Sequence, residues 1–161
     1  MVPVELRLLA LIIIANGTPI VAATILGRRG AWPVDGGRVW VDGYRLLGDS
    51  KTWRGVMLAP LATGAGAVLL GLPLWVGGVV GVAAMSGDVL SSFIKRRSGV
   101  PPSGRATGLD QIPESLLPLL AVAGEFALTG PAILSIVVGF VVLEITLSPI
   151  FHRLGLRDRP Y

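Results

Sequence analysis

The chain has 161 residues, enough for one domain, and 52% of them are hydrophobic while only 15% are charged. Soluble domains carry about a quarter charged residues, so the composition excludes that class and indicates a membrane protein that does not bind nucleic acid despite its net charge of +4. With no cysteine and one histidine, disulfides, thiolate nucleophiles and cysteine- or histidine-rich metal sites are also excluded, and any metal must have oxygen ligands.

Five apolar stretches are long enough, or nearly so, to cross the roughly 30 Å hydrocarbon layer of a bilayer. The sequence therefore predicts an all-α membrane protein with a single membrane domain over residues 1–161. The expected transmembrane helices span residues 4–26, 55–72, 73–95, 114–128 and 131–152.

The basic residues predict how these helices are oriented. Thirteen of the fourteen lysines and arginines lie in residues 28–54, 95–105 and 153–159, which five crossings would bring to one side. The positive-inside rule makes that side cytoplasmic. We therefore expect the N-terminus outside the cell membrane, the C-terminus in the cytoplasm, and two cytoplasmic loops, residues 27–54 and 96–113, that form the site.

The first of these loops contains two alternating runs around Asp42-Gly43, which predict an ordered β-hairpin. Residues 48–55 follow it and lead directly into the second helix. They combine flexible residues, cations and free backbone donors at a helix N-terminus, which suits phosphate, and the candidate binding residues are Asp49, Lys51, Thr52 and Arg54. The alternative is an interfacial cap in which the two cations reach toward lipid head groups.

Acidic, hydroxyl and basic side chains meet near the cytoplasmic end of the third helix. Spacings of three and four residues bring Asp88, Ser91 or Ser92, and Lys95 to one helical face. Placing a carboxylate at that depth in the membrane costs free energy, and such residues usually have a function. We therefore expect a site for metal and phosphate there. Arg96 and Arg97 extend its basic rim.

Two further acids, Asp110 and Glu114, precede or begin the fourth helix. Both could be capping acids that the helix dipole favours, and this alternative stays open for Glu114. A Mg²⁺ site in this chain needs carboxylates, and Asp88 is the companion nearest to Asp110. Asp88 and Asp110 are therefore the predicted Mg²⁺ ligands.

Polar residues also occur inside the other helices. Asn16 and Glu144 lie at depths that would face a central cavity, so we expect them to touch a lipid substrate. We interpret Glu125 as a helix-packing residue and His152 as part of interfacial packing.

Together these motifs carry a family resemblance. The signature region of the phosphatidate cytidylyltransferases, integral membrane enzymes that make CDP-activated lipids, resembles Gly87-Asp88-x3-Ser92-Phe-x-Lys95-Arg96-Arg97 followed by Gly108-Leu109-Asp110. The small size, the five spans and residues 48–55 are similar, more specifically, to the CDP-archaeol synthases. The likeness extends over most of the chain.

This resemblance implies Mg²⁺-dependent transfer of CMP from CTP to an isoprenoid ether-lipid phosphate, 2,3-di-O-geranylgeranylglycerol 1-phosphate, with release of pyrophosphate. It implies that Asp88 and Asp110 bind the metal, that Lys95 is catalytic, and that Arg96 and Arg97 contact phosphates. The chain departs from the larger relatives at Gln111, where they have arginine, and it lacks their Lys-Asp and His-Gly-Gly elements.

Two other functions are considered. A transporter or lipid-binding protein could use the intramembrane acids, but no inverted repeat is evident. A CDP-alcohol phosphotransferase would show a denser aspartate motif than Asp35-Gly36-Gly37-Arg38. The sequence leaves open a homodimer and the lipid chain selectivity.

Overall fold

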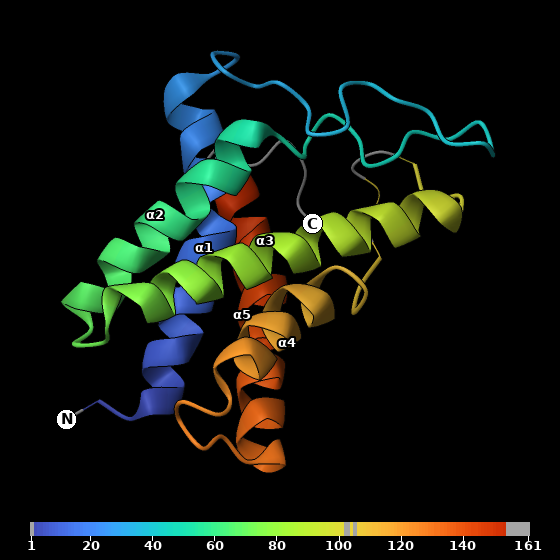
Figure 1. The fold of residues 1–161 in the computed structure, drawn as a ribbon. Helices are drawn as coiled ribbons and strands as arrows, with labels where there is room; N and C mark the ends of the chain where they lie inside the picture. The colour runs from blue at the N-terminus through green and yellow to red at the C-terminus, as the bar shows by residue number, and fades with distance from the viewer. Residues whose placement is uncertain (1, 102–103, 105, 154–161) are drawn as a thin grey trace.

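A computed structural model describes residues 2–101, 104 and 106–153 of the chain. Within these residues the regular structure is entirely helical (Figure 1). The elements are α1 (Val4–Leu26), α2 (Trp53–Leu69), α3 (Leu74–Arg97), α4 (Gln111–Val122) and α5 (Gly130–Arg153). The prediction of an all-α protein with five helices is confirmed.

Three of the helices are long and apolar enough to cross a membrane: α1, α3 and the Gly130–Pro149 part of α5. The helix α2 has 17 residues and α4 has 12. At 1.5 Å per residue, α4 is about 18 Å long and falls short of the roughly 30 Å hydrocarbon layer. The chain is therefore a membrane protein, while five complete crossings and the sides of the termini remain predictions.

The ends of the two shorter helices differ from those predicted, and local hydrogen bonds explain where they begin. Thr52 caps α2, because its hydroxyl accepts from the backbone N–H of Gly55 at 3.3 Å, so the helix begins at Trp53 and not at residue 55. In α4 the side chain of Gln111 accepts from the Gly108 N–H at 2.8 Å, which starts the helix at residue 111 instead of 114. This helix ends at Val122, and the chain then turns through a positive φ of 47° at Ala127.

The buried apolar core is shared by all five helices. Its members include Leu11 of α1, Ala67 of α2, Val80 of α3, Leu119 of α4 and Phe140 of α5. Burying apolar surface in this way fixes the helices relative to one another, and the polar residues discussed below lie outside this cluster.

The helix α3 packs closely against α2 through glycines. A Cβ atom at Gly77 would lie 2.2 Å from the carbonyl oxygen of Thr63, and one at Gly81 would lie 2.5 Å from the Cα of Pro60. Only hydrogen fits at these positions, as is typical of helix pairs that approach closely in lipid. The tight turn after α2 makes the two helices antiparallel neighbours (Figure 1).

A third glycine in α3 lets the start of α4 approach. A Cβ at Gly87 would lie 2.3 Å from the Pro113 carbonyl oxygen and 2.8 Å from the Glu114 backbone nitrogen. Because Gly87 immediately precedes Asp88, this contact brings Glu114 beside that aspartate. Figure 1 shows α4 running alongside the C-terminal half of α3.

Residues 27–52, which we call the first loop, extend from the end of α1 across to the end of α3 (Figure 1). A turn forms at Asp42-Gly43, where the Trp40 N–H donates to the Tyr44 carbonyl oxygen at 2.8 Å. The flanking runs pair only through one isolated antiparallel bridge between Val39 and Arg45, and neither is a strand. The predicted β-hairpin is thus not confirmed: the loop has an ordered turn with one isolated bridge beside it.

Candidate functional site

One largely buried ion pair joins the first loop to α3. Lys51, directly before the Thr52 cap of α2, donates from Nζ to the Asp88 carboxylate, and these side chains are 20% and 18% exposed. Burial alone would lower the pKa of Lys51, but the nearby carboxylates, Asp88 foremost, hold it above its ordinary value. Lys51 is therefore a charged ammonium beside Asp88.

A second acid completes the contacts of Asp88. A hydrogen bond joins its carboxyl group to that of Glu114 in the first turn of α4. Such a bond requires that one of the two groups carry a proton. The sequence left open whether Glu114 merely caps α4, and the structure instead directs its side chain to Asp88. The close approach at Gly87 makes this contact geometrically accessible.

A parallel ion pair lies at the other end of the same helix face. Lys95, in the last turn of α3, donates to Asp110 Oδ1 at 2.7 Å. Asp110 Oδ2 accepts from the Ala106 N–H at 3.0 Å, which orders the turn before α4. The two predicted Mg²⁺ ligands, Asp88 and Asp110, are thus each paired with a lysine, and both pairs lie between α3 and its neighbours.

Arg96 stands out among the basic residues because its guanidinium is buried yet partly unused. The residue is 3% exposed, and its Nε and Nη1 atoms have no hydrogen-bond partner in the described part of the chain. The negative charge of Asp110 acts on this guanidinium. Burying cationic N–H donors without hydrogen-bond acceptors costs free energy, and the oxygens of a bound phosphate group would accept from these donors.

One further cation, at the start of α2, binds backbone carbonyl groups of the first loop. Arg54 donates from Nη1 to the carbonyl oxygens of Gly27, at 3.0 Å, and Arg29. Asp49 is exposed and pairs with Arg45 at 2.9 Å. Of the residues predicted to bind phosphate before α2, only Lys51 is brought to Asp88, whereas Arg54 and Asp49 hold the loop.

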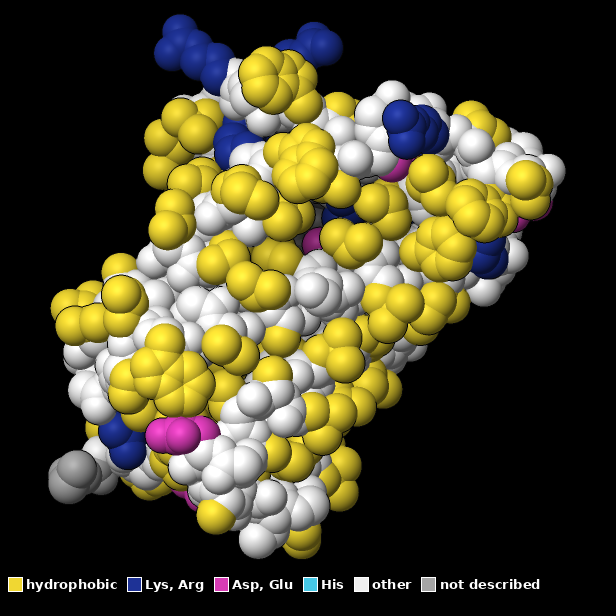
Figure 2. Space-filling model, in the orientation of Figure 1, with side chains coloured by type: hydrophobic (Ala, Val, Ile, Leu, Met, Phe, Trp, Pro, Cys, Tyr) yellow, Lys and Arg dark blue, Asp and Glu magenta, His cyan; other side chains and the backbone are white. Residues whose placement is uncertain are grey.

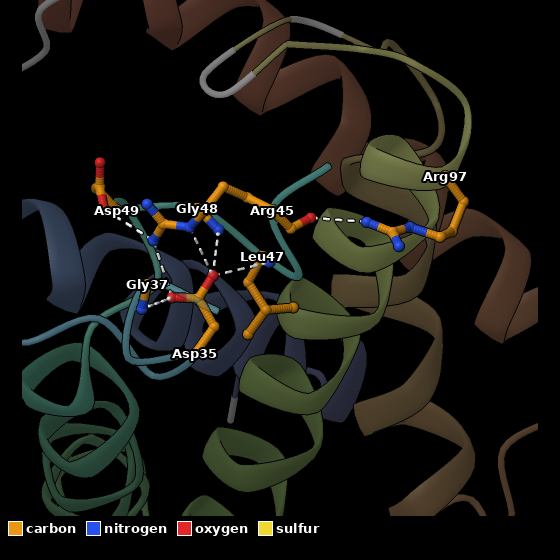
Figure 3. A network of polar contacts seen from close by, with 7 residues as sticks. All are labelled: Asp35, Gly37, Arg45, Leu47, Gly48, Asp49 and Arg97. Carbon is orange, nitrogen blue, oxygen red and sulfur yellow. Dashed lines mark hydrogen bonds and ion pairs between the residues drawn. The ribbon is translucent and has the colours of Figure 1, made fainter. Parts of the chain in front are cut away.

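The centre of the first loop is Asp35, which the sequence analysis did not single out (Figure 3). Its buried carboxylate accepts from the N–H groups of Gly37, Leu47 and Gly48 and from the Arg45 guanidinium, at 2.9–3.2 Å. Burial would raise the pKa of Asp35, but these donors hold it well below its usual range. The signal that could have revealed this role is Asp35-Gly36-Gly37, because an aspartate before glycines favours a turn closed by its own side chain.

Arg97 faces the loop as well. It donates to the Asp42 carboxylate at 3.0 Å. It also donates to the Arg45 carbonyl oxygen at 2.7 Å (Figure 3). Its guanidinium also lies over the rings of Trp40 and Phe93, 5.9 and 5.1 Å from their centroids. The contacts of the Arg97 side chain are thus made with the first loop and with Phe93.

Three predicted substrate-binding residues lie elsewhere on the helices. Ser92 is buried on α3, next to Ser91, whose hydroxyl donates to the Asp88 carbonyl oxygen. Asn16 is half-buried and donates to the Ile12 carbonyl oxygen of its own helix. Glu144 lies on α5, and its charge acts on Glu114 of the site.

An apolar groove of about 780 Å³ runs beside this charged cluster, between α2 and α3. Its walls carry Leu47, Val56, Met57, Pro60, Leu61, Val82, Met85, Ser86, Val89, Leu90 and Phe93. Its wall on α3 includes Ser86 and Val89, which lie on either side of Asp88 in the sequence, so the groove and the Lys51–Asp88 pair share the same stretch of α3. Figure 2 shows hydrophobic side chains over most of the visible face, with basic and acidic side chains in a recess among them.

Among the described residues, no three acidic or histidine side chains are grouped closely enough to hold a metal ion by themselves. Magnesium ordinarily binds through one or two carboxylates together with substrate phosphates and water. Asp88 and Asp110 provide oxygen ligands of that kind. The residues present therefore fit a Mg²⁺ ion that arrives with a nucleotide rather than one held in a protein cage.

Comparison with known proteins supports one family. The model of the CarS-like family, CDP-archaeol synthase, matches residues 4–74 and 66–161. The CDP-archaeol synthase of Methanosphaerula palustris is 37% identical over 166 residues, covering 89% of this chain and 96% of that protein. The CDP-archaeol synthase of Thermococcus kodakarensis is 34% identical, in a match that covers 91% of this chain and 89% of that protein.

A solved structure gives the same result. It is described as an intramembrane enzyme for archaeal membrane lipids biosynthesis, and it matches this fold with a TM-score of 0.72 at 31% identity. The match covers 87% of this chain and 89% of that one. Sequence and fold agree over nearly the whole length, and the chain belongs to the CDP-archaeol synthase family.

Proposed function

We propose that this protein transfers CMP from CTP to 2,3-di-O-geranylgeranylglycerol 1-phosphate, giving a CDP-activated ether lipid and pyrophosphate. Family membership makes the chain a membrane-bound nucleotidyltransferase for archaeal lipids. It therefore supersedes the alternative of a transporter. The particular lipid phosphate, the metal and the roles of individual residues are the parts that we propose.

One observation carries the proposal: the two lysine–aspartate pairs and an apolar groove are all built on α3. Lys51–Asp88 and Lys95–Asp110 provide charges for phosphates and a metal. The groove offers Met57, Leu61 and Val82, all largely exposed, to a hydrocarbon chain. A substrate with an ionic head and an isoprenoid tail matches both features at once.

The proposed reaction needs no nucleophilic side chain from the protein. An oxygen of the lipid phosphate forms a bond to the α-phosphorus of CTP as the bond from that phosphorus to the bridging oxygen of the β-phosphate breaks. Pyrophosphate leaves with the electron pair, and the attacking oxygen is already ionised, so no general base is needed. Positioning and charge neutralisation suffice.

Each polar group then has a defined task. Lys51 and Lys95 exchange their aspartate partners for phosphate oxygens, and Arg96 satisfies its unpartnered donors on the same phosphates. Asp88 and Asp110 would hold Mg²⁺, which when bound neutralises charge that develops on the phosphates. The ion pairs keep these four side chains oriented before the substrates arrive.

The groove predicts how a bulky side chain should act. Leu90→Trp narrows it and should raise the KM for the lipid phosphate about tenfold, with the KM for CTP unchanged. Steady-state kinetics with each substrate varied in turn measures this. Leu69→Trp, at an exposed leucine at the end of α2 outside the groove, is the matched control. An equal rise in both KM values would contradict a lipid role for the groove.

The expected sidedness of the site is also testable. Val41 is 95% exposed at the turn of the first loop, and Val2 is exposed near the N-terminus. In a chain without cysteine, Val41→Cys should react with a membrane-impermeant maleimide only in inverted vesicles, and Val2→Cys only in intact cells. The reverse pattern would overturn the cytoplasmic orientation.

The direct test of the proposed function is incubation of the purified protein with radiolabelled CTP, Mg²⁺ and the lipid phosphate. A labelled CDP-lipid, resolved by thin-layer chromatography, is expected, together with an equal amount of pyrophosphate. Phosphatidate in place of the ether lipid tests the lipid class. Absence of any labelled lipid with either acceptor would refute the proposal.

A further inference from the structure

Hydrogen bonds and ring contacts around Arg97, the last residue of α3, join this helix to the first loop. Its Nη1 donates to the Asp42 carboxylate at 3.0 Å, and its Nη2 donates to the Arg45 carbonyl oxygen at 2.7 Å. Trp40 of the loop packs edge-on against Phe93 of α3, with 5.8 Å between ring centroids, and the guanidinium lies over both rings. The loop is thus fastened to α3 around one side chain.

The loop that Arg97 holds is ordered internally by Asp35. The carboxylate ties Gly37 on one side of the turn to Leu47 and Gly48 on the other and also binds the Arg45 guanidinium (Figure 3). Buried hydrogen bonds to a charged acceptor are strong and directional. A shift at Arg45 is therefore passed on to the whole segment between residues 35 and 48.

Lys51 lies just after this segment, at the base of the loop. The Val34 N–H donates to the Lys51 carbonyl oxygen at 2.7 Å, and the Trp53 N–H donates to the Trp32 carbonyl oxygen at 3.0 Å. The two backbone segments at the loop base are thereby joined at the point where Lys51 reaches toward Asp88. The position of the loop and the position of the Lys51 ammonium are consequently linked.

From these contacts we infer that Arg97 is a positioning residue, which fixes the first loop on α3 so that Lys51 reaches Asp88. It acts through Asp42 and the Arg45 backbone, to which its two terminal nitrogens donate, and leaves phosphate binding to its neighbour Arg96, whose Nη1 has no partner among the described residues. The inference rests on the proposed function for its kinetic consequence. The placement of the loop can be measured without any substrate.

The test compares Arg97→Ala with Asp42→Asn, which removes the ion pair from the loop side but keeps an oxygen for the Tyr44 N–H. Both variants should lower kcat/KM for CTP by about tenfold to a hundredfold, because small displacements of a charged group have effects of that size. The double variant should be no worse than either single one. Arg97→Lys should recover part of the loss, and Arg38→Ala, at an exposed arginine that forms no ion pair within the described residues, should behave as wild type.

A spin-label pair at Val41→Cys and Ile94→Cys in this cysteine-free chain reports the position of the loop directly. Double electron–electron resonance should give one narrow distance in the parent and a broader, longer distribution in Arg97→Ala and Asp42→Asn. If Asp42→Asn has wild-type kinetics, or if Arg97→Ala loses activity with the narrow distance intact, Arg97 contacts substrate and the inference is wrong. Because the distance measurement needs no CTP, a chain without cytidylyltransferase activity would refute the proposed function and leave the loop placement decided.

Discussion

Asp88→Asn is expected to lower kcat at least about a hundredfold at saturating Mg²⁺, while the protein remains folded. Asparagine keeps the size and a hydrogen-bonding oxygen but lacks the charge that pairs with Lys51 and would bind the metal. The affected carboxylate contacts both Lys51 of the first loop and Glu114 of α4. CDP-lipid formation from labelled CTP measures the loss, and thermal unfolding in detergent measures integrity.

Two further variants distinguish a site residue from a packing residue. Glu125→Gln changes an exposed acid after α4 in the same chemical way and should keep wild-type turnover. Combining Asp88→Asn with Lys51→Met removes the cation that the first change leaves without its partner. Recovery of turnover in the double variant would mean that Asp88 only neutralises Lys51, and an active Asp88→Asn enzyme would disprove a catalytic role.

Asp110→Asn should have an effect of similar size but of a different kind. We expect kcat to fall about a hundredfold and the Mg²⁺ concentration for half-maximal activity to rise, because one of two anionic ligands is lost. The asparagine oxygen can still accept from the Ala106 N–H, so the turn before α4 should persist. A Mg²⁺ titration at fixed CTP separates the two effects.

Lys95 supplies the control for this prediction. It is the ion-pair partner of Asp110 at 2.7 Å, so the combination of Asp110→Asn with Lys95→Met removes both charges of the pair. A ligand role predicts that the double variant still needs more Mg²⁺ than wild type. Normal Mg²⁺ dependence in Asp110→Asn would show that the carboxylate serves only the lysine and the loop.

Much of the fold could be predicted from the sequence because helices that cross a membrane require long apolar stretches, which are easily recognised in a sequence. The predicted first and last residues of α1 were both correct, because Pro3 immediately precedes the helix and Gly27 immediately follows it. The ends of α4 were missed because they depend on Gln111 bonding back to Gly108 and on the turn at Ala127, neither of which appears in hydropathy.

The pairing of site residues was harder to predict than their identity. Helical spacing correctly brought Asp88 and Lys95 to one face of α3, but it could not show that Lys51 and Asp110 would be their partners from other segments. The Glu114 contact depends on the packing permitted by Gly87. The Asp35 carboxylate binds backbone N–H groups that lie far from it in the sequence, so its role in ordering the loop can be recognised only in the folded structure.

The open side of the groove between α2 and α3 has a kinetic consequence. Its exposed wall at Leu61 and Val82 is continuous with the lipid-facing surface, so a hydrophobic substrate can enter sideways and its product can leave the same way. Neither has to pass through water, and encounters occur by lateral diffusion in two dimensions. The effective substrate concentration is then the mole fraction of the acceptor in the bilayer, and diluting the membrane with inert lipid should slow the reaction even when the bulk amounts are unchanged.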